Sequence, residues 1–447
     1  MIKRVFLFLS ILASLLSCSD DDSFTTSRSA LLTFSTDTIC MDTVFSTIGS
    51  STYSFWAFNN ADDGIRISRA YLKNGNQTGF RVNVDGQYLN NSQGSTVSDI
   101  EVRKGDSIRV FVEITAPQNM QEVAQQVSDD LVFLLESGVE QKVHLRSYAW
   151  DAWLMTNAVI DKDSVIESKK PIVVYGNILV KEGVILTIRK TNLYFHDKCG
   201  IDVHGTLITD SVMMRGDRLD HMFDYLPYDR VSGQWSGVIF RGTSFDNILK
   251  DTDLHSGTFG VRCDSARLDP TAQRLYMERC VIHNSKGNGI EATCSYVNLV
   301  DCQITNSLGD CVRLDGGAYN INGCTIAQFY PFSADRGVAI RFINGNSKYG
   351  HPLMQMNCTN SIITGYAEDE MMGTQTQAKA EFNYLFEKCL IRTPLINDDE
   401  HFKEIIWEKP SDEIEGKKNF VKIDETNFIY DFHLDEQSPA KGLGCYR

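Results

Sequence analysis

Charged side chains recur in the second half of the chain, each at the centre of a three-residue apolar segment. These centres are Arg262, Glu291, Arg313 and Arg341. If the segments are neighbouring strands, alternate residues point to opposite faces, and the four charged centres form one outward row. Such a row could bind an anionic glycan, or it could be a solvated ladder of cross-strand ion pairs. The residue types favour the ladder, and Arg262, Arg313 and Arg341 remain candidates for ligand binding.

Two carboxylates lie beside this row, because Asp310 and Asp315 bracket the segment around Arg313. Hydrolysis of a glycosidic bond uses two carboxylates roughly 5–10 Å apart. Asp310, Asp315, Arg313 and Arg341 are therefore the catalytic candidates, and calcium is the cofactor that such carboxylates could hold. Aspartates more often cap turns, and no calcium-binding repeat occurs. We therefore expect no metal site, no cofactor and no catalysis by this chain.

A loop rich in aromatic and charged residues offers a third candidate site. It runs from Arg215 to Trp235 and includes His221 and Tyr228. Loops on a rigid scaffold often bind ligands, so Tyr228 and Trp235 could stack on sugar rings. The alternative is a loop folded back over the flank of the domain, with Trp235 partly buried.

Cys18 is the one cysteine for which the sequence predicts a chemical role. Residues 1–17 have a charged start and a short apolar run, as in a secretory signal peptide, and the run is too short to span a membrane. The motif Leu15-Leu16-Ser17-Cys18 resembles the bacterial lipobox. That resemblance implies lipidation of Cys18, with acyl chains such as palmitate holding the protein in a membrane.

Residues 18–29 form an acidic linker, in which Ser19-Asp20-Asp21-Asp22 follows Cys18. This acidic run resembles the export signal of surface lipoproteins in Bacteroidota. We therefore expect an outer-membrane protein facing the cell surface, with a periplasm-facing location as the alternative. The net charge of −15 argues against nucleic acid as a partner.

Short alternating strands in residues 30–150 predict a β-sandwich. Tyr53–Phe58 and Ser107–Ile114 alternate in polarity, and turn residues such as Lys104-Gly105-Asp106 separate the strands. The stretch resembles immunoglobulin-like domains of the Hydin/major-sperm-protein type, in its Thr47-Ile48-Gly49 opening and its Gly-Asp-Ser step before a strand. Such domains are usually spacers or binding modules.

A repeat in residues 165–400 predicts a right-handed parallel β-helix. Cys280-Val281-Ile282-His283-Asn284 returns after 22 residues at Cys302 and after 22 more at Cys324. Because coils stack about 4.8 Å apart, the three cysteines should form an inward column, and Asn284 and Asn306 an asparagine ladder. Twelve cysteines minus Cys18 leave eleven, an odd number that cannot all pair. We expect these thiols to fill the core.

The repeat region resembles the pectate-lyase-like β-helix superfamily over residues 170–395. The whole chain resembles right-handed β-helix repeat lipoproteins of Bacteroidota, in which a lipobox, a sandwich and a β-helix follow in this order. Lys170–Gly176 and Gly233–Val238 support the likeness. Residues 401–447, with Ser438-Pro439-Ala440-Lys441-Gly442, resemble the C-terminal cap that covers the open end of other β-helices.

The sequence thus predicts an all-β protein with a β-sandwich followed by a right-handed parallel β-helix. We expect a surface lipoprotein that binds a polysaccharide or another surface ligand without catalysis, and that meets the membrane through lipid on Cys18. The superfamily includes polysaccharide lyases and hydrolases, which implies, as an alternative, an enzyme acting on the outer face near Arg313. A structural or adhesive rod is the third interpretation.

Overall fold

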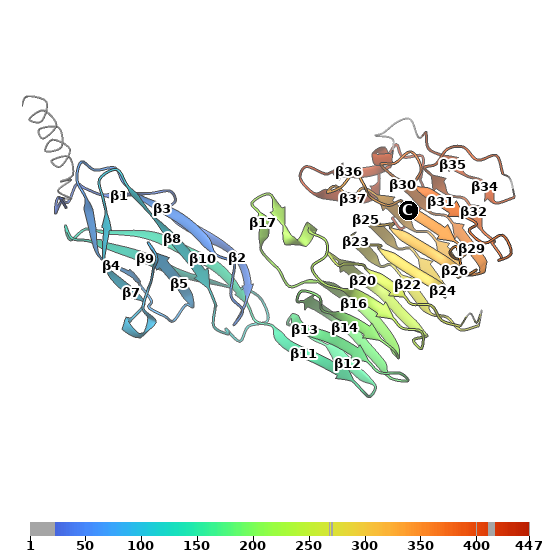
Figure 1. The fold of residues 1–447 in the computed structure, drawn as a ribbon, viewed down its shortest axis with the longest axis horizontal. Helices are drawn as coiled ribbons and strands as arrows, with labels where there is room; N and C mark the ends of the chain where they lie inside the picture. The colour runs from blue at the N-terminus through green and yellow to red at the C-terminus, as the bar shows by residue number, and fades with distance from the viewer. Residues whose placement is uncertain (1–22, 268, 270, 399, 410–415, 447) are drawn as a thin grey trace, which may run out of the picture. The chain divides into compact units, whose positions relative to one another are not determined.

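The computed structural model describes residues 23–267, 269, 271–398, 400–409 and 416–446. The predicted signal peptide, Cys18 and the first linker residues lie outside the described residues, so their processing stays a prediction. The chain divides into two compact units, Met1–Asp151 and Ala152–Arg447 (Figure 1). In the part that the structure describes, no helix has the length and apolar character needed to cross a membrane.

The first unit is a sandwich of two five-stranded sheets. One sheet has the order β1 (Leu32–Phe34), β3 (Tyr53–Asn59), β8 (Ser107–Ile114), β5 (Phe80–Val84) and β6 (Gln87–Tyr88). The other has the order β2 (Thr38–Phe45), β10 (Glu140–Trp150), β9 (Gln125–Leu135), β4 (Ile65–Leu72) and β7 (Thr96–Val102), and the 3-10 helix η1 (Asn91–Gln93) precedes β7. Strand β8 shows the predicted alternation, because Ile108, Val110 and Val112 are buried between the sheets.

The second unit is a parallel β-helix, as predicted, in which strands of successive coils pair in parallel. Its first half contains β11 (Trp153–Ile160), β12 (Ser164–Glu167), β13 (Ile172–Val180), β14 (Ile185–Phe195), β15 (Gly200–Val203), β16 (Thr206–Gly216), β19 (Gly237–Phe240), β20 (Asn247–His255), β21 (Val261–Cys263), β22 (Leu275–Glu278), β23 (Val281–Ser285) and β24 (Ile290–Val300). Its second half contains β25 (Gln303–Ser307), β26 (Val312–Asn322), β27 (Thr325–Gln328), β28 (Ile340–Ile343), β29 (Leu353–Thr359), β30 (Ile362–Gly365), β31 (Met371–Thr374), β32 (Leu385–Glu387), β33 (Leu390–Ile391), β34 (Phe402–Lys403) and β35 (Ile406–Trp407). The β-helix begins before the predicted boundary at residue 165, because β11 pairs in parallel with β13.

The predicted cysteine column is present in the core of the β-helix. Cys280, Cys302 and Cys324 are buried, and the residues that follow them pair in register from β23 to β25 to β27. All eleven cysteines that the structure describes are free thiols, and nine of them are buried. The packing role predicted for all eleven is wrong for Cys40, which is exposed because its neighbours Ile39 and Met41 take the inward positions of β2.

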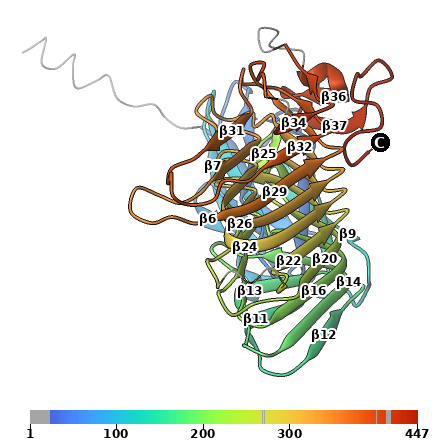
Figure 2. The same ribbon diagram turned by 90° about the vertical axis from the view of Figure 1, so that its right-hand side faces the viewer.

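The C-terminal segment covers a side of the coils, whereas the sequence interpretation placed it over the open end. After the 3-10 helix η3 (Gly416–Asn419), β36 (Phe420–Asp424) and β37 (Ile429–Leu434) form an antiparallel hairpin beside the later coils (Figure 2). Phe420 and Phe432 pack on outward residues of β30 and β33, such as Ile362 and Leu390. The apolar face of the hairpin therefore finds its partner on the flank of the coils.

Candidate functional site

The charged centres predicted from the sequence form one row on the β-helix. Arg262 pairs with Glu291, Glu291 with Arg313, and Arg313 with Arg341, across β21, β24, β26 and β28. All four are partly exposed, and the residues on either side of each are buried. Because those apolar neighbours point into the core and side chains alternate along a strand, the charged side chains point outward. We call these four residues the arginine row.

A buried carboxylate holds two arginines of this row. Asp310 precedes β26, and its side chain is only 5% exposed. It accepts hydrogen bonds from Arg341 Nε (2.8 Å), Arg313 Nη1 (3.3 Å) and the backbone N–H of Val338 (3.0 Å). With so many donors on its oxygens, Asp310 is poorly placed to act as a general base.

The other members of the site meet separate partners. Arg262 donates to Asp264 at 3.1 Å, and Glu291 accepts from Asn288 at 3.0 Å. Asp315 accepts from the backbone N–H of Gly345 at 2.8 Å and lies 3.1 Å from His351 Nδ1. Among the described residues, therefore, no ion pair joins two members of the row, and the cross-strand ladder that the sequence favoured is replaced by ion pairs with aspartates outside the row.

The aromatic loop is folded back on the β-helix. It contains the hairpin β17 (His221–Phe223) and β18 (Leu226–Pro227), followed by the 3-10 helix η2 (Tyr228–Arg230). Trp235 is 1% exposed, stacks on Phe195 with 4.6 Å between ring centroids, and donates to the carbonyl of His255. Its predicted role in ligand binding is therefore contradicted, because the indole is part of the core. Tyr228 is partly exposed, and the guanidinium of Arg218 covers its ring.

A pocket of about 380 Å³ opens beside the last arginine of the row. Met372 lines it and pairs in register with Arg341, whose Nη1 lies 3.2 Å from the Met372 sulfur. Sequence reasoning missed this pocket because its walls come from later coils that lack the regular repeat. We call it the aromatic pocket, and its lining is Phe342, Asp369, Met371, Met372, Gly373, Thr374, Tyr384, Thr393, Pro394, Leu395, Ile396 and Phe402.

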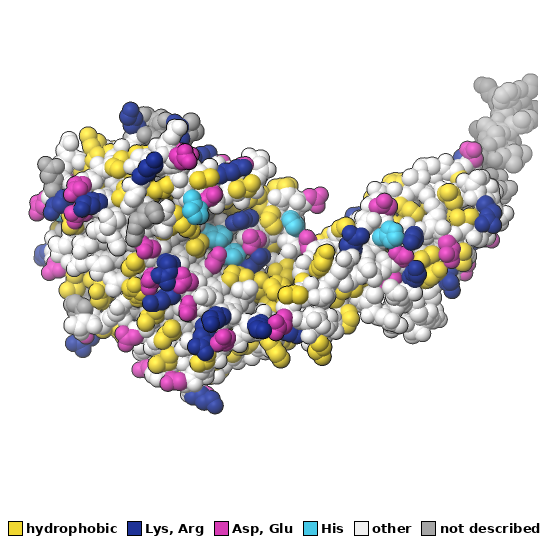
Figure 3. Space-filling model, turned by 180° about the vertical axis from the view of Figure 1, so that it is seen from behind, with side chains coloured by type: hydrophobic (Ala, Val, Ile, Leu, Met, Phe, Trp, Pro, Cys, Tyr) yellow, Lys and Arg dark blue, Asp and Glu magenta, His cyan; other side chains and the backbone are white. Residues whose placement is uncertain are grey.

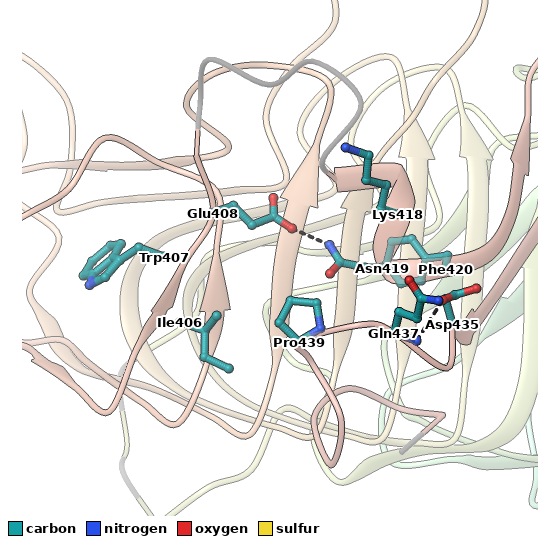
Figure 4. Close-up of a pocket in the computed structure, with 9 residues that line it drawn as sticks. All are labelled: Ile406, Trp407, Glu408, Lys418, Asn419, Phe420, Asp435, Gln437 and Pro439. Carbon is teal, nitrogen blue, oxygen red and sulfur yellow. Dashed lines mark hydrogen bonds between the residues drawn. The ribbon is translucent and has the colours of Figure 1, made fainter.

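A second pocket, of about 410 Å³, lies between β35 and the C-terminal hairpin. Figure 4 shows Asn419 turned toward Glu408, which accepts its side-chain N–H. Glu408 also accepts from Thr364 Oγ1 at 2.8 Å and lies 3.7 Å from the buried Arg392 guanidinium. Because these buried polar groups satisfy one another, they join the C-terminal segment to the coils.

A cluster of histidine and aspartate residues lies on another outer face. β20 and β23 place His255 in register with His283, and Asp253 lies two residues before His255. Figure 3 shows several histidines gathered among acidic and basic side chains on the β-helix. Sequence reasoning did not single out this cluster, although the repeat contains the signal. Aligning Thr252–Ser256 with Cys280–Asn284 places the two histidines in one column.

Comparisons with known proteins support the fold. Residues 158–326 match the family model described as the right handed beta helix region. A comparison with curated proteins found no match.

Two solved structures of GH87 alpha-1,3-glucanases are similar at 8% sequence identity. One is the catalytic unit of the thermostable enzyme from Streptomyces thermodiastaticus strain HF3-3, covering 79% of this chain and 88% of that chain with a TM-score of 0.26. The other is a catalytic domain in complex with nigerose, covering 86% of this chain and 94% of that chain with a TM-score of 0.25. Likeness at this level says nothing about what this chain binds.

Proposed function

We propose that this protein is a lipid-anchored surface lipoprotein whose β-helix binds a glycan at the aromatic pocket, without catalysis of its own. The observation that carries the proposal is the continuity of the pocket with the arginine row through Arg341 and Met372. Apolar pockets with a few polar groups at the rim are typical of small-ligand sites, and their volumes run from about 300 to 1,000 Å³.

The chemistry of the pocket suits a sugar residue. Tyr384 is partly exposed and offers aromatic surface for the C–H face of a sugar ring, while the partly exposed Asp369 offers a carboxylate. Beside the pocket, Arg341 contacts Met372 and shares the single carboxylate of Asp310 with Arg313. This balance favours a hydroxyl-rich or anionic glycan over a cationic ligand.

The absence of catalysis in this proposal rests on how the carboxylates are engaged. Asp310 and Asp315 each accept a backbone N–H, and each lies against a basic side chain. A hydrolase needs one carboxyl group that can donate a proton and a second one that stays ionised. A lyase or hydrolase acting near Arg313 remains the alternative outcome of the test below.

The test incubates the purified full chain with a panel of uronate and neutral polysaccharides. We expect retention by at least one polysaccharide in affinity electrophoresis, with no new reducing or unsaturated ends. Tyr384→Ala should abolish the retention, and Arg189→Ala, which removes an exposed ion pair with Glu167 on an early coil, should leave it unchanged. Newly released ends would overturn the non-catalytic proposal, and failure to bind any member of the panel would overturn the glycan proposal.

The lipid anchor is proposed from the lipobox and has its own test. Cys18→Ser should release the protein from the membrane fraction, and mass spectrometry of the mature wild-type N-terminus should find acyl chains on Cys18. Surface exposure should make the wild-type protein sensitive to protease added to intact cells. An unmodified Cys18 would contradict the anchor, and protection from protease would favour the periplasm-facing alternative.

A further inference from the structure

Two neighbouring coils bring histidine and carboxylate ligands together outside the proposed glycan site. In β20 and β23, the inward residues Leu254 and Ile282 are fully buried and in register. His255 and His283 therefore project from the opposite face, and their rings stack with 4.6 Å between centroids. Register alone makes them neighbours, although they are far apart in the sequence.

The possible ligand atoms are close to the spacing that a metal ion requires. Asp253 Oδ1 lies 2.6 Å from His255 Nδ1 and 3.8 Å from His283 Nε2, and one ligand atom from each residue lies within 4.8 Å of the others. Zinc bonds of about 2.1 Å place tetrahedral ligand atoms roughly 3.4 Å apart. Because the two rings stack nearly parallel and each lone pair lies in its ring plane, at least one imidazole must turn out of the stack to bind a shared ion.

A fourth residue supplies the support that metal-binding histidines usually have. His255 Nε2 lies 3.0 Å from Asp229 Oδ1, and Asp229 in turn accepts from Arg215. Metal-bound histidines almost always donate their second ring N–H to a carboxylate or carbonyl, which fixes the ring and its tautomer. Asp229 reaches this place from η2, so the folded-back loop completes the cluster.

A metal ion must compete with a proton at His255. Burial opposes protonation of this ring, but Asp253 and Asp229 on its two sides outweigh it and raise the pKa of His255, so metal binding has to release that proton.

We propose that Asp253, His255 and His283 bind one divalent transition-metal ion, with Zn²⁺ as the best fit, and that Asp229 orients His255. Two imidazole nitrogens with one carboxylate suit zinc and its neighbours, whereas calcium and magnesium prefer oxygen ligands. Three protein ligands leave one tetrahedral position for water or another ligand. The Asp253 side chain is 40% exposed, which gives the ion a path from solvent.

The test measures metal binding directly on the purified full chain after treatment with a chelator. Titration calorimetry with Zn²⁺ should give one ion per chain, and titration with Co²⁺ should give the visible absorption of tetrahedral cobalt. These readouts need no variant and no activity. The absence of stoichiometric Zn²⁺ binding to the wild-type chain would overturn the proposal.

Variants then locate the ion. Asp229→Asn should weaken Zn²⁺ binding by about 10- to 100-fold, and Asp253→Asn or His283→Gln should weaken it further, with circular dichroism confirming the fold of each variant. His433→Gln is the matched control, because Asp431 and His433 repeat the same spacing with a 2.7 Å contact on an exposed strand. Unchanged binding in both ligand variants, or loss of binding in the control, would contradict this site.

Discussion

The β-sandwich and the β-helix place similar side chains in different surroundings. In the sandwich, neighbouring strands come from unrelated stretches of sequence, so an outward pair such as Arg81 and Glu113 does not recur from strand to strand. In the β-helix, each coil lies on the one before it, so a residue that returns in the repeat meets its own equivalents. The arginine row, the stacked histidines and the cysteine column are three products of this register.

One ion pair from each region can be compared by its exposure. The Arg81–Glu113 pair is 48% and 27% exposed, whereas the side chain of Asp310 beneath Arg313 and Arg341 is 5% exposed. Exposed pairs contribute little to stability, but breaking a buried one leaves uncompensated charge. The variants below test this difference, from the largest expected effect to the smallest.

Asp310→Ala should have the largest effect. It removes the carboxylate from two guanidiniums and leaves the Val338 N–H without its acceptor, so we expect a loss of about 3–5 kcal/mol in the free energy of unfolding of the β-helix. Urea denaturation followed by circular dichroism measures the loss. The matched change in the sandwich, Glu113→Ala, should cost about 1 kcal/mol or less. Equal losses in the free energy of unfolding for the two variants would show that burial does not set the contribution of these carboxylates to stability.

Substitution of a cysteine in each region should give the next largest difference in stability. Cys302→Ser places a hydroxyl among buried thiols and should lower the free energy of unfolding by about 1–3 kcal/mol. Cys40→Ser changes an exposed side chain and should stay within about 0.5 kcal/mol of the wild type. A thiol reagent applied to the native protein gives an independent check, because Cys40 should react before Cys302. Rapid labelling of Cys302 would refute the packed column.

Arg241→Gln tests another ion-pair cluster of the β-helix through its pH dependence. Arg241 joins Asp202 and Asp264 across neighbouring coils, and its hydrogen bonds hold the pKa of Asp202 below its ordinary value. A depressed carboxyl pKa stabilises the folded state above the ordinary aspartate value of about 4, and this stabilisation is lost as the pH falls through the folded pKa. Because the ion pairs of Arg241 are partly exposed, Arg241→Gln should lower the free energy of unfolding by about 1 kcal/mol at pH 7.

The cost of Arg241→Gln should shrink when the urea denaturation is repeated at pH 3. Arg189→Gln, which loses only the exposed pair with Glu167, serves as the control with a smaller cost at both pH values. A cost of Arg241→Gln that does not change between pH 7 and pH 3 would contradict the electrostatic origin.

The sequence predicted those features of the β-helix whose residues recur at a regular spacing. The 22-residue step places Cys302 over Cys280, and the apolar residues around Arg313 turn its side chain outward, so both columns were predictable. For Trp235 the sequence left two alternatives open, because burial of the indole depends on a loop that folds back through contacts with Phe195 and His255.

Irregular spacing explains the rest of what the sequence missed. Alignment of the repeats places His255 and His283 in one column, but Asp229 joins them from a loop that has no place in the repeat. The aromatic pocket combines Met372, Tyr384 and Phe402 from coils with insertions, where no fixed step predicts which residues meet.

The most direct test of the central proposal compares an arginine from each region in one binding experiment. The glycan retained best in the polysaccharide panel is titrated into the wild type, Arg341→Gln and Arg81→Gln, and the dissociation constant is measured by calorimetry. Binding at the rim of the aromatic pocket predicts at least tenfold weaker binding for Arg341→Gln, or about 1.4 kcal/mol, and unchanged binding for Arg81→Gln. Equal affinity of the wild type and Arg341→Gln would contradict a glycan site at the end of the arginine row.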